Sequence, residues 1–160
     1  MKNLKRIILY AAFSAYAVFM LWLLFGMRSG RLFWAPDGYW ETLRENINLI
    51  PFRTISQYAE KLVNTKANGD SVINLFGNVI MFVPLGFFLP AVFPKARPFR
   101  RSMLIALLIL CAVELIQFFT LLGSLDIDDV ILNMVGVLVG YGVWRIGKRI
   151  SDYRRLPKTV

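Results

Sequence analysis

The stretch LDIDDVILNMVG, residues 125–136, places three carboxylates and an asparagine at the start of an otherwise apolar helix. The apolar residues continue to Ile146, so residues 127–146 supply the roughly 20 residues that a helix needs to cross a bilayer core of about 30 Å. This helix is therefore expected to span a membrane, with Asp126, Asp128 and Asp129 near one surface. Because charged groups are costly within lipid, acids at this position need a functional or structural explanation.

Three further blocks are similarly long and apolar, and they cover residues 7–27, 72–93 and 103–122. Of the 160 residues, 57% are apolar and only 18% are charged, which is a low charge content for a soluble domain. Composition and block length together predict an all-α protein, a four-helix transmembrane bundle that forms a single domain over residues 1–160. Cys111 is the only cysteine, so no intramolecular disulfide can form.

The basic residues are distributed unevenly around these blocks. Thirteen of the 19 Lys and Arg flank the two chain ends and the loop between the second and third blocks, whereas the turn between the third and fourth blocks has none. The positive-inside rule then predicts that both termini are cytoplasmic and that residues 28–70 are extracytoplasmic. These cations flank spans and form no stripe interleaved with stacking aromatics, so no nucleic-acid partner is expected.

The extracytoplasmic segment between the first two spans contains two amphipathic stretches. WETLRENINL, residues 40–49, can form a short helix that ends before Pro51. Apolar residues from Ile55 to Val63 recur at the spacing of a second helix with one apolar face. Both helices are expected on the membrane surface or over the mouth of the bundle. A turn at residues 68–69 and a cap at Asp70 or Ser71 are expected to precede the second span.

Polar side chains from three spans are expected at one depth. A helix rises about 1.5 Å per residue, so the depths below the outer surface are about 8 to 12 Å for Asn78, Glu114, Gln117 and Asn133. Groups three or four residues apart, such as Asp129 and Asn133, also share a helix face. No Lys or Arg within spans two to four can pair with Glu114, so one polar cavity that opens outward is the least costly arrangement. Its expected lining is Asn74, Asn78, Glu114, Gln117, Asp129 and Asn133.

Structural roles are the alternative for several of these groups. The amide side chains within spans, including that of Asn74, can form hydrogen bonds between helices and have no other role. Asp126 and Asp128 lie at a helix N-terminus, where carboxylates cap free amides, and capping is the favoured role for Asp126. Asp128 points off the polar stripe. Asp129 and Glu114 fit a capping or packing role least well, so they are the main candidates for function.

Two features of the second and fourth spans concern packing. Gly136 and Gly140 form a small-xxx-small face, which predicts a close approach to another helix. Pro84 lies in the middle of the second span and is expected to kink it.

Four motifs resemble, in order and spacing, the VanZ-like family of bacterial membrane proteins. They are NINLIPF (46–52), GNVIMFVPLGF (77–87), ELIQF (114–118) and DIDDVILNMVGVLVGY (126–141). The resemblance implies a multi-pass protein of the bacterial cytoplasmic membrane, from a family associated with resistance to the glycopeptide teicoplanin. Matched motif by motif, it marks the polar residues Asn48, Asn78, Glu114, Gln117, Asp126, Asp129 and Asn133, and with them Pro51, Phe52, Pro84, Gly86 and Gly136.

One difference from the family pattern concerns an arginine. Some relatives have an arginine just before the acidic run, where this chain has Ser124 and Leu125. Arg53, from the extracytoplasmic segment, is the residue expected to supply a guanidinium instead.

Three functions are compatible with these residues. In the first, the cavity binds the head group of a membrane lipid or cell-wall lipid precursor, or a glycopeptide. Carboxylates suit sugar hydroxyls or ammonium groups, whereas a phosphate would need Arg53 or a bridging divalent cation, Mg²⁺ or Ca²⁺.

The other two functions require chemistry or transport. In an intramembrane enzyme, Glu114 and Asp129 would act as acid and base, or would be metal ligands that hold Mg²⁺ or Ca²⁺. Histidine is absent, which argues against a zinc site and against a Ser-His or Cys-His nucleophile. A cation-coupled transporter would also use an intramembrane carboxylate, but four spans are few for this unless the chain forms a homo-oligomer.

Overall fold

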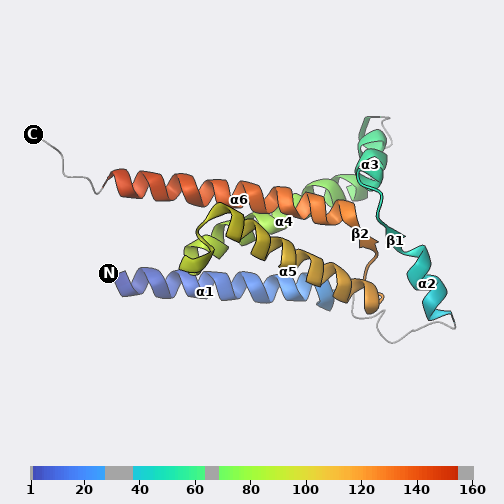
Figure 1. Cartoon of the computed structure of the whole chain (residues 1–160), viewed down its shortest axis with the longest axis horizontal. Coiled ribbons are helices and arrows are strands. Elements are labelled where there is room, and N and C mark those ends of the chain that lie inside the picture. The colour runs from blue at the N-terminus through green and yellow to red at the C-terminus, as the bar shows by residue number, and fades with distance from the viewer. Residues whose placement is uncertain (1, 28–37, 64–68, 155–160) are drawn as a thin grey trace, which may run out of the picture.

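A computed structural model describes residues 2–27, 38–63 and 69–154 of the chain (Figure 1). Residue 68 and the side chains of residues 69–71 are not described, so the turn and the cap expected there lie outside the described part of the structure. Four long helices dominate: α1 (Lys2–Leu21), which a π-helical turn η1 (Trp22–Gly26) continues, α4 (Gly69–Val92), α5 (Phe99–Phe119) and α6 (Ile127–Tyr153). Each is long and apolar enough to cross a membrane. The prediction of an all-α protein with four spans is confirmed.

The four helices form a bundle in which the start of α1 and the end of α6, here called the termini, lie at one end (Figure 1). Its apolar core is built from buried residues of α1, α4, α5 and α6, with Leu110 and Val137 fully enclosed. At the same end as the termini, the 3-10 turn η3 (Pro94–Ala96) connects α4 to α5. The opposite end carries the three short elements that follow α1, and these shape the candidate site.

The short elements are α2 (Tyr39–Glu45), β1 (Ile47–Asn48) and α3 (Arg53–Val63). A second two-residue strand, β2 (Leu125–Asp126), lies just before α6 and pairs in parallel with β1, Asn48 opposite Asp126. The helix expected over residues 40–49 therefore ends at Glu45, because the next residues must extend to pair with β2. The expected second amphipathic helix is present as α3.

Glycines bring α4 and α6 into backbone contact. A Cβ placed on Gly136 would overlap the carbonyl of Val79, and one on Gly140 would overlap the carbonyl of Val83. From the other side, a Cβ on Gly86 of α4 would overlap the carbonyl of Val137. The small-xxx-small face of Gly136 and Gly140 therefore packs as expected, and this contact holds α6 against α4.

We expect Gly140→Ala to destabilise the folded protein by about 1 to 3 kcal/mol, because its methyl group would push the two backbones apart. Gly142→Ala is the matched control, since a Cβ at Gly142 meets nothing within 4 Å. Its stability should be unchanged or higher by up to about 1 kcal/mol, since alanine favours a helix over glycine. The free energy of unfolding of each variant would be measured by titrating the protein in mixed detergent micelles with dodecyl sulfate. Equal stability of the two variants would contradict the close contact.

Candidate functional site

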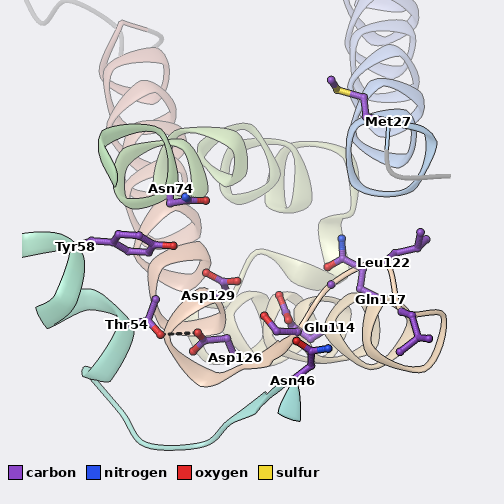
Figure 2. A pocket seen from close by; sticks show the side chains of 13 residues that line it. Met27, Asn46, Thr54, Tyr58, Asn74, Glu114, Gln117, Leu122, Asp126 and Asp129 are labelled. Carbon is purple, nitrogen blue, oxygen red and sulfur yellow. Dashed lines mark hydrogen bonds between the residues drawn. The ribbon is translucent and has the colours of Figure 1, made fainter. Parts of the chain in front are cut away.

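A polar cavity of about 720 Å³ lies at the end of the bundle opposite the termini. Side chains from α3, α4, α5 and α6 project into one space there (Figure 2). The cavity is lined by Met27, Asn46, Thr54, Tyr58, Asn74, Glu114, Gln117, Leu121, Leu122, Gly123, Ser124, Asp126 and Asp129. The polar groups of three spans thus converge, as depth and helix face had indicated.

Three carboxylates give the cavity its electrostatic character. Glu114 and Asp126 are buried, with 5% and 6% of their surface exposed, and Asp129 is partly buried. Among the described residues no Lys or Arg lines this space. Because the walls have low dielectric, ionised carboxylates here would create a strongly negative potential that favours cations and hydrogen-bond donors.

Asp126 is held by three donors. It is the N-cap of α6, where its Oδ1 accepts the Asp128 backbone N–H at 2.9 Å. Its Oδ2 accepts the Thr54 hydroxyl at 2.7 Å, and its Oδ1 also accepts the Asn48 side-chain amide at 3.1 Å. The expected capping role of Asp126 is confirmed. Asn48 does not line the cavity but joins β1 to this carboxylate.

Asp128 has a role that its position in the sequence did not reveal. It is fully buried and accepts hydrogen bonds from three backbone N–H groups at the start of α3: Phe52 at 2.6 Å, Thr54 at 2.7 Å and Ile55 at 3.1 Å. It therefore caps a helix about 75 residues earlier in the chain. Phe52, whose N–H donates to this carboxylate, adopts a left-handed φ of 66° at the turn that leads into α3.

The N-terminal end of α3 supplies two residues that the sequence analysis missed. Thr54 and Tyr58, one helical turn apart, both line the cavity. They lie there because Asp126 and Asp128 fix the start of α3 over the mouth of the bundle. The one available sequence clue was Thr54, a residue type common at helix starts, three residues after Pro51.

Two amides connect the spans around the cavity. The Asn78 side chain of α4 donates to Oδ1 of Asp129 at 2.7 Å, so it supports Asp129 and does not itself line the cavity. The Gln117 side chain of α5 donates to the carbonyl of Leu24 at 3.0 Å and also lines the cavity. Such interhelical hydrogen bonds contribute about 1 kcal/mol or less each.

Two more of the expected site residues, in addition to Asn48 and Asn78, do not line the cavity. Asn133 is buried one turn beyond Asp129, beside the close α4–α6 contact at Gly136, and does not line the cavity. Its Oδ1 has no hydrogen-bond donor among the described residues. Arg53 is exposed at the start of α3 and does not line the cavity either, since the backbone there turns inward to Asp128.

The carboxylates of the cavity do not form a metal site by themselves. In the described ranges, no three His, Cys, Asp or Glu side chains lie close enough together to hold a metal ion. Mg²⁺ or Ca²⁺ at Glu114 or Asp129 would need most of its usual six to eight oxygen ligands from amides, water or a bound molecule.

The chain is similar to known proteins of one family. The family model described as VanZ/LLP1 matches residues 13–148. A relative, Protein VanZ from Enterococcus faecium, is 26% identical over 117 residues, which are 73% of this chain and 63% of that protein. The alignment thus spans less than two thirds of the relative's length. No solved structure matches.

Proposed function

Because the chain belongs to the VanZ-like family and has four apolar helices able to cross a membrane, we propose that it binds an envelope lipid or lipid-linked cell-wall precursor by its head group. The head group would enter the cavity from the outer leaflet of the bacterial cytoplasmic membrane. Binding would contribute to resistance to teicoplanin, the glycopeptide with which the family is associated.

The observation that carries this proposal is the set of three carboxylates around one cavity without a basic side chain from the described residues. Glu114, Asp126 and Asp129 can accept hydrogen bonds and balance positive charge, but they would repel an uncompensated phosphate. Since Arg53 lies outside the cavity, the group recognised would be an ammonium or a cluster of sugar hydroxyls.

The cavity's size and place support a head group as the ligand. A volume of about 720 Å³ lies in the range of small-molecule sites. The cavity is at the ends of four apolar helices, where the head groups of one leaflet would be found. An amphiphile could therefore place its polar part among the carboxylates while its chains stay in lipid.

The charge distribution supports an outward-facing cavity. In the sequence, thirteen of the 19 Lys and Arg precede the first span, lie between the second and third spans or follow the fourth. The start of α1, η3 and the end of α6 lie at the end of the bundle away from the cavity. By the positive-inside rule that end faces the cytoplasm. The cavity would then open toward the side where cell-wall precursors are assembled into polymer.

The test compares a head group that carries an ammonium with one from which the ammonium has been removed. We expect purified protein to bind short-chain phosphatidylethanolamine about tenfold more tightly than the same lipid with an acetylated amine, because acetylation removes the ammonium. A glucosyl diacylglycerol of equal chain length tests whether the cavity instead recognises sugar hydroxyls. Binding would be followed by native mass spectrometry. If neither lipid bound better than the acetylated one, the head-group proposal would be wrong.

An enzymatic function is the second candidate, and one observation favours it: Glu114 and Asp129, from different spans, line the same cavity. Two such groups could serve as acid and base on a bound head group. In the same mass spectrometry experiment, catalysis would change the mass of the lipid with time, and Glu114→Gln would abolish this change. Binding without any mass change would leave the binding function as the better description.

A further inference from the structure

A second hollow, of about 410 Å³, lies toward the end of the bundle that carries the termini. It is formed where the loop before α5 meets the last turns of α6. Its chemistry is opposite to that of the acidic cavity, since it is lined by four cations and one acid: Arg97, Arg145, Lys148, Arg149 and Asp152.

Aromatic rings form the apolar wall of this hollow. The ring of Tyr141 packs edge-on against Phe99 with centroids 5.4 Å apart, and it also contacts Trp144 at 5.5 Å. Tyr141 is buried, and its hydroxyl donates to the carbonyl of Arg97 at 2.8 Å. This hydrogen bond fixes the loop that carries Arg97 beside α6, so the two sources of positive charge are held together.

The cations of α6 share one face. Arg145, Lys148 and Arg149 are spaced by three and four residues, and Tyr141 lies one turn before them on the same face. Lys148 pairs with Asp152 at 2.9 Å. Because Asp152 is the one acid among the residues that line the hollow, it can balance only one of the four cations. The side chains that line the hollow therefore carry a net positive charge.

We propose that this hollow is a binding site for the phosphate of an anionic phospholipid in the leaflet on the side of the termini. The four spanning helices put it at the level of lipid phosphates, and guanidinium groups bind phosphate oxygens in pairs. Trp144 and Tyr141 are residue types that favour the boundary between head groups and acyl chains. The aromatic wall would contact the glycerol and upper chains while the cations hold the phosphate. This site does not depend on the function of the acidic cavity.

The experiment titrates the full chain in uncharged detergent with dioctanoyl phosphatidylglycerol and with dioctanoyl phosphatidylcholine. The wild type is expected to bind the anionic lipid at least about tenfold more tightly, and the preference should shrink as salt is raised. The double variant Arg145→Gln, Arg149→Gln should lose most of this preference. Arg145→Lys, Arg149→Lys should retain part of it, because the charge stays but paired hydrogen bonds are lost.

A matched control removes the same charge elsewhere. Lys5 and Arg6 are exposed near the start of α1 and do not line the hollow, so Lys5→Gln, Arg6→Gln should leave the preference intact. All variants change exposed residues, and unaltered thermal unfolding without lipid would confirm their folding.

Three results would overturn the proposal. If the Lys5 and Arg6 control lost as much preference for the anionic lipid as the Arg145 and Arg149 variant, net charge alone would attract the lipid. Inorganic phosphate that binds as tightly as the lipid would mean a site for free phosphate. A soluble oligoglutamate peptide that displaces the lipid at lower concentration would point to an acidic protein partner instead.

Discussion

Replacing Asp128 with alanine is expected to detach α3 from the bundle and to lower the free energy of unfolding by about 3 kcal/mol or more. The carboxylate is fully buried, and it accepts the backbone N–H groups of Phe52, Thr54 and Ile55. Without it, these donors would lack a partner, and the left-handed backbone at Phe52 would lose the hydrogen bond that holds it. Amide hydrogen exchange across residues 52–63 should rise sharply.

An asparagine at this position should have an intermediate effect. One carboxylate oxygen accepts from Phe52 and the other from both Thr54 and Ile55, and an amide can replace only one of these oxygens. Asp152→Ala is the control, because Asp152 is exposed and pairs with Lys148 on the surface, where an ion pair contributes about 1 kcal/mol or less. If the amides of α3 exchanged at the wild-type rate in Asp128→Ala, the cap would not stabilise α3.

The spans and their polar faces could be predicted from sequence because both depend on local regularities. Twenty apolar residues, a rise of about 1.5 Å per residue and a repeat of about 3.6 residues determine which groups lie at one level and on one face. This reasoning brought Glu114, Gln117 and Asp129 together correctly. It also identified the face of Gly136 and Gly140 that contacts α4.

The arrangement of the extracytoplasmic segment could not be predicted in the same way. The pairing of β1 with β2 and the capping of α3 by Asp128 join residues more than 70 positions apart, and no periodicity encodes them. The same contacts decide that Thr54 faces the cavity and that Arg53 faces outward. Asn78 and Asn133 illustrate a related limit, since a shared face does not specify whether a side chain meets a cavity, a carboxylate or a packed helix.

If the cavity has the proposed function, the double variant Glu114→Gln, Asp129→Asn is expected to abolish head-group binding and the proposed protection against teicoplanin while the protein stays folded. Both changes keep the shape of the side chain, and the amide oxygen introduced at position 129 could still accept the hydrogen bond that Asn78 donates. Neutral amides are also less costly than carboxylates within a membrane, so stability should stay within about 1 kcal/mol of the wild type.

Loss of function should be large because two charges are removed from one cavity. If each carboxylate makes a charge-assisted hydrogen bond to the ligand, each neutralisation costs about 1.5 to 3 kcal/mol, and the pair weakens binding by at least about a hundredfold. The measurements are lipid binding by the purified variant and the inhibitory concentration of teicoplanin for a susceptible bacterium that expresses it. Asp152→Asn controls for loss of a carboxylate outside the cavity.

The two measurements together separate a binding role from a structural one. Lost binding and lost protection in a protein of unchanged stability would assign function to the carboxylates themselves. Full protection with unchanged binding would mean that Glu114 and Asp129 only hold the spans together, as Gln117 does through its bond to Leu24. Retained binding with lost protection would instead place their role after binding, in a chemical step within the cavity, because a neutral amide can hydrogen-bond a ligand but cannot exchange a proton with it.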